Sequence, residues 1–198
     1  KFVYVANDGA PASVSAYTIN PANGALIVVA GSPFATASAA SHPLWVTVDP
    51  TGRFAYTANQ ATDDVSAFTI NPANGALTLT GTVPAGASPV AVTVDSTGKF
   101  AYVSTTGTNR IMTYAIDGAT GALTAQVPAA ARNPEGMAMT KGTALASTPK
   151  FAYVANSGSA NVSTYAIDPA TSLLTPVGSP VGAGTSPNSV SVDPSGRF

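Results

Sequence analysis

Cysteine is absent from this chain of 198 residues, and charge is scarce. The lack of cysteine excludes a disulfide and a thiolate metal site. Only 9% of the residues are charged, against a usual share of about 25%. The formal net charge is -1, so no basic field exists to attract nucleic acid or an anionic membrane. No apolar run approaches the ~18 residues that a membrane-spanning helix needs.

Three residue types that often carry chemistry occur once each, as His42, Glu135 and Trp45. A single histidine without cysteine argues against a transition-metal site, and the sequence indicates no other cofactor. Hydrophobic residues make up 45% of the chain, which argues against disorder. The sequence begins at Lys1, inside a repeat and without a methionine. We therefore expect the natural chain to begin earlier.

The pair Phe-x-Tyr returns four times, and a fifth copy is cut off at Phe198. The phenylalanines are spaced by 52, 46, 51 and 47 residues. A self-similar period of this size indicates a stacked or circular array of one small unit.

Each unit divides into four short apolar stretches separated by turn signals. The first stretch ends in a turn such as Asp49-Pro50-Thr51-Gly52, and the second carries Phe-x-Tyr. The third and fourth flank a turn such as Asn71-Pro72-Ala73-Asn74-Gly75, a strong hairpin signal. The predicted first strands are 44–48, 90–94, 137–139 and 190–192, and the third strands are 14–19, 65–70, 111–116 and 162–167. The fourth strands begin at Leu26, Leu77, Leu123 and Leu174, and the third unit carries an insertion at 141–148.

Four antiparallel strands per unit are typical of a β-propeller blade. We predict an all-β fold, with one complete or partial propeller domain over residues 1–198. It has four four-stranded antiparallel blades, whose repeats begin near Phe2, Phe54, Phe100 and Phe151. A parallel β-helix is the rival repeat fold, but its turns are shorter and lack four hairpin signals per unit.

The ends of the chain leave the closure of the ring open. We expect a strand at 186–193 to pair with a second strand, either of the next blade or of the first. The chain then forms part of a seven- or eight-bladed ring, half of a ring completed by self-association of two chains, or a self-closed four-bladed ring. An open arc exposes strand edges, which favours further pairing.

Two repeated segments carry a resemblance that covers nearly the whole chain. They read Val-Asp-Pro-x-Gly-Arg-Phe-Ala-Tyr-x-Ala-Asn and Val-Ser-x-Tyr/Phe-x-Ile-Asn/Asp-Pro-Ala-x-Gly-x-Leu. In these motifs the sequence resembles the lactonase-type seven-bladed propellers, which include 6-phosphogluconolactonase-like and carboxymuconate-cyclising proteins and the related YVTN repeats. The resemblance implies that His, Glu and Arg side chains act around the channel opening on carboxylated or phosphorylated sugars and lactones.

Residues that break the repeat are the candidates for function, because residues present in every blade build the blade. The charges that repeat are the basic residues before each Phe-x-Tyr and the turn aspartates, and we interpret them as solvated turn charges: Lys1, Arg53, Lys99, Lys150, Arg197, Asp49, Asp95, Asp117, Asp168 and Asp193. The first strand of a blade is the innermost, so residues at its start should meet at one mouth of the channel.

The candidates at this mouth come from different blades. Glu135 is the candidate general base, Arg132 would hold an anionic substrate, and His42 would share the proton transfer. The candidate substrate-binding residues are Trp45, Asn133 and Asn188. Each of the main candidates also has a structural interpretation: Glu135 with Arg132 as a surface ion pair, His42 as a residue that caps backbone, and Trp45 as packing in the channel wall.

Two functions are compatible with these residues. The first is hydrolysis of a sugar lactone at the channel mouth, a carboxylic ester hydrolase activity. Family members often carry His-Pro-His at the strand start, where this chain has His42-Pro43-Leu44. The second is therefore a non-catalytic propeller that binds a surface ligand or has a structural role. Low charge and abundant small residues favour a secreted, periplasmic or cell-surface location.

Overall fold

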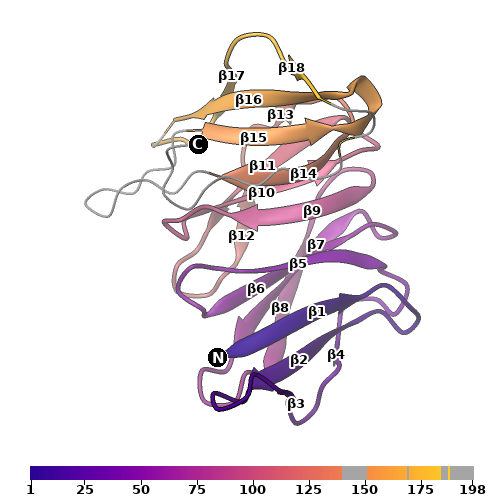
Figure 1. The fold of residues 1–198 in the computed structure, drawn as a ribbon, viewed down its shortest axis with the longest axis vertical. Coiled ribbons are helices and arrows are strands. Elements are labelled where there is room, and N and C mark those ends of the chain that lie inside the picture. Colours follow the sequence, from indigo (N-terminus) through magenta and orange to yellow (C-terminus); the bar gives the residue numbers. More distant parts are fainter. Residues whose placement is uncertain (140–150, 169, 184–186, 188–198) are drawn as a thin grey trace.

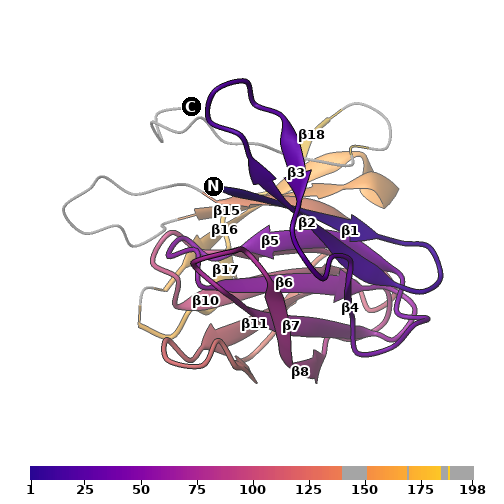
Figure 2. The same cartoon turned by 90° about the horizontal axis from the view of Figure 1, so that it is seen from below.

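The computed structural model describes residues 1–139, 151–168, 170–183 and 187 as four antiparallel sheets. The second sheet shows the repeat most simply, with its strands in chain order from the inner to the outer edge (Figure 2). These strands are β5 (Pro43–Val48), β6 (Phe54–Asn59), β7 (Asp64–Ile70) and β8 (Leu77–Pro84).

The third and fourth sheets follow the same order, whereas the described part of the first begins with its second strand. In each of these three sheets two short strands share the outer edge. The third sheet contains β9 (Pro89–Val94), β10 (Phe100–Thr105), β11 (Arg110–Ile116), β12 (Leu123–Ala125) and β13 (Ala129–Ala130). The fourth contains β14 (Pro134–Met139), β15 (Phe151–Asn156), β16 (Asn161–Ile167), β17 (Leu174–Pro176) and β18 (Val181–Gly182), with a 3-10 turn, η1, at Ser157–Ser159. The first contains β1 (Phe2–Asn7), β2 (Ser13–Ile19), β3 (Leu26–Val28) and β4 (Phe34–Ala35).

The all-β prediction of four repeated antiparallel blades is confirmed. The second strands begin at the four predicted phenylalanines, and the fourth strands begin at the four predicted leucines. The third strands begin one residue earlier than expected, at Ser13, Asp64, Arg110 and Asn161. The predicted strand at 186–193, apart from Pro187, and the insertion at 141–148 lie outside the described residues.

The described residues form an open arc of four blades. The first and fourth sheets lie at opposite ends of the long axis, so these residues do not form a self-closed four-bladed ring (Figure 1). The exposed side of the first sheet agrees with this arrangement. Leu26 is 52% exposed, whereas the equivalent Leu77 and Leu123 are only 6% and 8% exposed because each packs under the preceding blade.

The hydrophobic core lies in the seams between the blades rather than in one central cluster. Each of the three seams has its own group of buried side chains, represented by Phe68, Tyr114 and Tyr165. All six residues of β6 are buried, because a middle strand is covered by a blade on either side. Burial on both faces leaves little room for charged side chains, in keeping with the low charge of the sequence.

The Phe-x-Tyr pair fastens each blade to the next. The hydroxyl of Tyr56 donates to the carbonyl oxygen of Gly121 at 2.9 Å, and Phe54 packs against the same glycine. The first blade repeats this contact, since Tyr4 donates to Gly75 at 2.9 Å. Both glycines end the hairpin turn of the next blade at positive φ, 75° and 77°. We call this contact of the phenylalanine and tyrosine with the hairpin glycine the blade joint.

The third blade joint departs from the other two. The hairpin of the fourth blade has Ser172 (φ 57°) where the other hairpins have glycine. The hydroxyl of Tyr102 is buried and has no hydrogen-bond partner among the described residues. Burial, with the nearby Asp95 carboxylate as a second cause, raises the pKa of Tyr102 well above its usual range.

This difference predicts opposite outcomes for the same substitution. Tyr56→Phe should lower the free energy of unfolding by about 1 kcal/mol, because it removes a satisfied hydrogen bond. Tyr102→Phe should leave it unchanged or raise it slightly, because it removes a buried hydroxyl that has no partner. Urea denaturation of both variants measures the contrast, and equal losses would show that Tyr102 is bonded in solution.

The turn aspartates of the second and third blades are not solvated, contrary to the interpretation from the sequence. Asp49 is 4% exposed and Asp95 is 0% exposed. The Oδ1 atom of Asp49 accepts hydrogen bonds from the amides of Arg53 (2.8 Å) and Phe54 (2.7 Å), and Oδ2 accepts from the amide of Thr51 (3.0 Å). These carboxylates therefore fix the turn between the first and second strands from inside.

Candidate functional site

The inner strands begin together at one end of the blades. Each start follows a residue in the left-handed conformation, namely His42 (φ 48°), Ser88 (φ 55°) and Asn133 (φ 44°). The preceding blade holds two of these residues in place. The amide of Ser88 donates to Oδ1 of Asp63 at 2.8 Å, and that of Asn133 donates to Oδ1 of Asn109 at 2.7 Å.

A hollow of about 400 Å³ opens at this end, and we call it the channel-mouth hollow. Its walls come from the starts of β5, β9 and β14 and from the residues that follow β6 and β10. The polar and aromatic side chains among them are Trp45, Gln60, Thr106, Asn133 and Glu135. Three blades therefore contribute to one hollow.

Glu135 is held by a short chain of hydrogen bonds. The hydroxyl of Ser157 donates to Oε1 of Glu135 at 2.5 Å. The same hydroxyl accepts a hydrogen bond from Nδ2 of Asn133 at 2.6 Å. Asn133 thus directs the serine proton toward the carboxylate. A carboxylate with a fixed orientation beside an open hollow can accept a proton from a bound water.

Trp45 gives the hollow an aromatic wall. The side chain is 44% exposed, so it is available to a ligand and is not fully packed in the channel wall. Gln60 and Thr106 add an amide and a hydroxyl group to the same surface. An aromatic face beside hydrogen-bonding groups suits a ligand that has both an apolar face and hydroxyl groups, as a sugar ring has.

His42 and Arg132 lie beside this hollow rather than in its described wall. Nδ1 of His42 lies 2.9 Å from Oδ1 of Asp8, and both side chains are about half exposed. Arg132 lines a separate hollow of about 380 Å³, in which Asn133 is the residue shared with the channel mouth. The described residues contain no ion pair between Arg132 and Glu135. Asn188 lies outside the described residues.

Three polar residues of the site were not identified from the sequence. Gln60, Thr106 and Ser157 are each the first residue after a second strand, the position that Asp8 occupies in the first blade. The sequence did contain a signal for them, because this position differs in all four blades while Ala-Asn precedes it in three of them. Among the described residues, no group of three or more histidine, cysteine or acidic residues is placed to hold a metal ion. No helix in the described part is long and apolar enough to cross a membrane.

Repeated four-stranded blades, seam cores and a hollow at the inner strand starts define the class of β-propellers. The chain belongs to the family of lactonase seven-bladed β-propellers, whose model matches residues 1–94 and 84–192. No curated protein matches the sequence.

Solved structures share the fold. A proposed 6-phosphogluconolactonase from Bacteroides uniformis superposes with a TM-score of 0.80 at 19% identity, covering 92% of this chain and 52% of that one. One from Bacteroides fragilis gives 0.80 at 22%, with 96% and 53% covered. The periplasmic gluconolactonase of Pseudomonas aeruginosa gives 0.73 at 23%, with 93% and 52% covered. The chain thus spans about half the length of these relatives.

Proposed function

We propose that this protein hydrolyses a sugar lactone in the channel-mouth hollow, with Glu135 as the general base. The observation that carries the proposal is the fixed Glu135 carboxylate, which shares a hollow with the exposed face of Trp45. The family and the names of the solved relatives support the same reaction class.

The reaction needs one proton acceptor and one water molecule. Glu135 takes a proton from water as the water oxygen bonds to the lactone carbonyl carbon. The ring C–O bond then breaks, the carbonyl re-forms, and the proton passes from Glu135 to the leaving ring oxygen. The product is an open-chain hydroxy acid. Trp45 would stack on the sugar face, and Gln60, Thr106 and Asn133 would bind its hydroxyl groups.

Glu135→Gln is the direct test of this proposal. The amide keeps the size of the side chain but cannot take the proton, so the rate on glucono-δ-lactone or its 6-phosphate should fall at least ~100-fold. Proton release at constant pH measures the rate. Asp117→Asn makes the same chemical change in a hairpin turn of the third blade and should retain full activity. Wild-type protein that is inactive on both lactones would overturn the proposal.

The second candidate is a non-catalytic binding propeller located outside the cytoplasm. The half-exposed Trp45 and its polar neighbours favour it, since an aromatic face beside hydrogen-bonding groups can bind a sugar without any reaction. Because Trp45 is the only tryptophan, its fluorescence reports occupancy of the hollow directly. A fluorescence change with lactone in the absence of turnover would favour binding over hydrolysis.

A further inference from the structure

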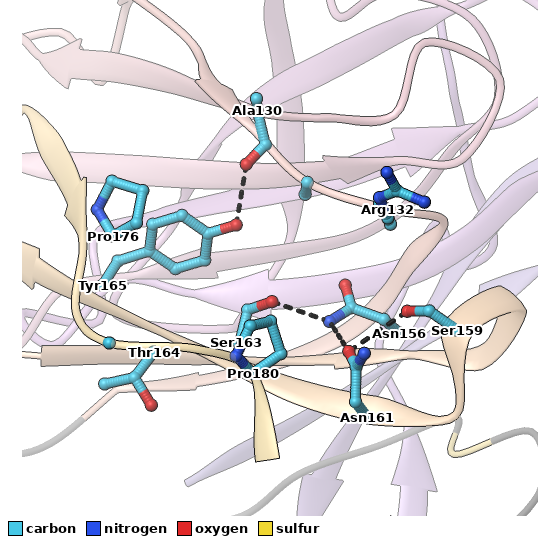
Figure 3. A pocket seen from close by; sticks show the side chains of 12 residues that line it. Ala130, Arg132, Asn156, Ser159, Asn161, Ser163, Thr164, Tyr165, Pro176 and Pro180 are labelled. Atoms are coloured by element: carbon cyan, nitrogen blue, oxygen red, sulfur yellow. Dashed lines mark hydrogen bonds between the residues drawn. The ribbon is translucent and has the colours of Figure 1, made fainter. Parts of the chain in front are cut away.

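A further hollow, of about 310 Å³, opens in the seam between the third and fourth blades (Figure 3). Residues 130–132 form one side, and β16 with the turn between β17 and β18 forms the other. None of its lining residues belongs to the described lining of the channel-mouth hollow. We call it the seam hollow.

One lining residue of the seam hollow is small at a strand position where the third blade carries a large one. Met112 pairs with Val103 in the third blade, and Ser163 pairs with Val154 at the same register in the fourth. Met112 packs into the seam between the second and third blades. Ser163, which shares its small side chain with Ser15 and Ser66 at the same position, lines the seam hollow instead.

An unsatisfied acceptor lies in the wall of this hollow. Nδ2 of Asn156 donates to Oδ1 of Asn161 and to Oγ of Ser163, both at 2.9 Å. Oδ1 of Asn156 is buried and has no hydrogen-bond partner among the described residues. Figure 3 shows this oxygen on the side of the amide that faces Ala130 and Arg132.

A comparison with the second blade shows which hydrogen bond Asn156 lacks. Asn59 occupies the same strand position and donates to Ser66 in the same way, at 2.7 Å. Its Oδ1, however, accepts a hydrogen bond from Oγ1 of Thr57 at 2.9 Å. The equivalent of Thr57 in the fourth blade is Val154, which has no hydroxyl group. The described residues therefore leave the acceptor of Asn156 without a donor.

Arg132 adds a positive charge to the same hollow. Its side chain lines the hollow (Figure 3), and it makes no hydrogen bond or ion pair with any other described residue. A guanidinium group binds a carboxylate in a bidentate manner, and the amide oxygen requires an O–H or N–H donor. Pro176 and Pro180 supply apolar walls. The volume lies at the lower end of the range for small-molecule sites.

We propose that the seam hollow binds a small hydroxycarboxylate. The carboxylate pairs with Arg132, and a hydroxyl group of the ligand donates to Oδ1 of Asn156. The site does not depend on catalysis at the channel mouth, because it shares no described lining residue with it.

Calorimetric titration with D-gluconate tests the proposal on the whole chain. We expect a dissociation constant below about 1 mM. Sorbitol, which lacks the carboxylate, and hexanoate, which lacks the hydroxyl groups, should each bind at least ~10-fold more weakly. An absence of gluconate binding, or equal binding of all three, would overturn the proposal.

Two variants locate the site. Ser163→Met should abolish binding by filling the hollow as Met112 fills its own seam. Its matched control is Ser15→Met, since Ser15 holds the equivalent position in the first blade and also accepts a hydrogen bond from an asparagine, Asn7, at 2.9 Å. That control should bind gluconate as the wild type does, and circular dichroism checks the fold of both.

Val154→Thr probes the acceptor without changing the shape of the hollow. The new hydroxyl should satisfy Oδ1 of Asn156 as Thr57 satisfies Asn59, and so weaken gluconate binding about fivefold. Unchanged affinity in both Ser163→Met and Val154→Thr would place the ligand elsewhere. Trp45 fluorescence would then show whether that place is the channel mouth.

Discussion

Gly121→Ala is expected to be among the most destabilising single substitutions in this protein, with a loss of about 3 kcal/mol in the free energy of unfolding. A β-carbon at this position would lie well under 3.0 Å from the ring of Phe54. Phe54 is 4% exposed, so its ring has no free space into which to move. Alanine would also be held at a φ of 75°, which side chains disfavour.

Gly52→Ala separates the two causes. Gly52 has a φ of 72°, and a β-carbon there would meet nothing within 4 Å. Gly52→Ala should therefore lower the free energy of unfolding by only about 1 kcal/mol, which is the cost of holding alanine at a positive φ. Urea denaturation of the two variants measures the difference. Equal losses would mean that the contact between Phe54 and the hairpin does not fasten the blades in solution.

Asp49→Ala is the second large effect that we expect. Removing the carboxylate leaves the amides of Thr51, Arg53 and Phe54 without the acceptor that they share. Burying unsatisfied donors costs about 1–3 kcal/mol each when no water replaces the acceptor. Because this turn lies near the surface, we expect a total loss of about 3 kcal/mol rather than the full sum.

Asp117→Ala is the matched control for Asp49→Ala. Asp117 also accepts hydrogen bonds from turn amides, those of Ala119 and Thr120, but its turn is exposed. Water can replace its carboxylate, so thermal denaturation should show only a small change. A comparable loss in both variants would show that burial is not what makes Asp49 important.

Much of the fold was predictable because the repeat places the same signals at fixed spacing. The starts at Phe54 and Leu77 needed only the turn chemistry of Asp49 to Gly52 and Asn71 to Gly75. The burial of Asp49 was not predictable in this way. A turn aspartate has the same local sequence whether the chain folds over it or leaves it in water.

The sequence showed the blade joint only as the repeated Phe-x-Tyr motif and did not show which residues the motif contacts. Tyr56 and Gly121 are 65 residues apart, and glycine has no side chain from which a contact with tyrosine could be predicted.

In the candidate site the sequence was misleading even for residues that are close together in the chain. Arg132 and Glu135 are three residues apart in the sequence, yet they line different hollows because Asn133 turns the chain between them. Sequence proximity therefore suggested a pair that the described residues do not form.

The direction of the blade joint bears on how the chain acquires its structure during synthesis. In the first two blade joints the tyrosine contacts a hairpin that is synthesised later, 71 residues on for Tyr4 and 65 residues on for Tyr56. The tyrosine of such a blade can therefore form this hydrogen bond only after more than one further repeat has left the ribosome. We therefore expect the blades to dock one after another during synthesis, in the order in which they leave the ribosome.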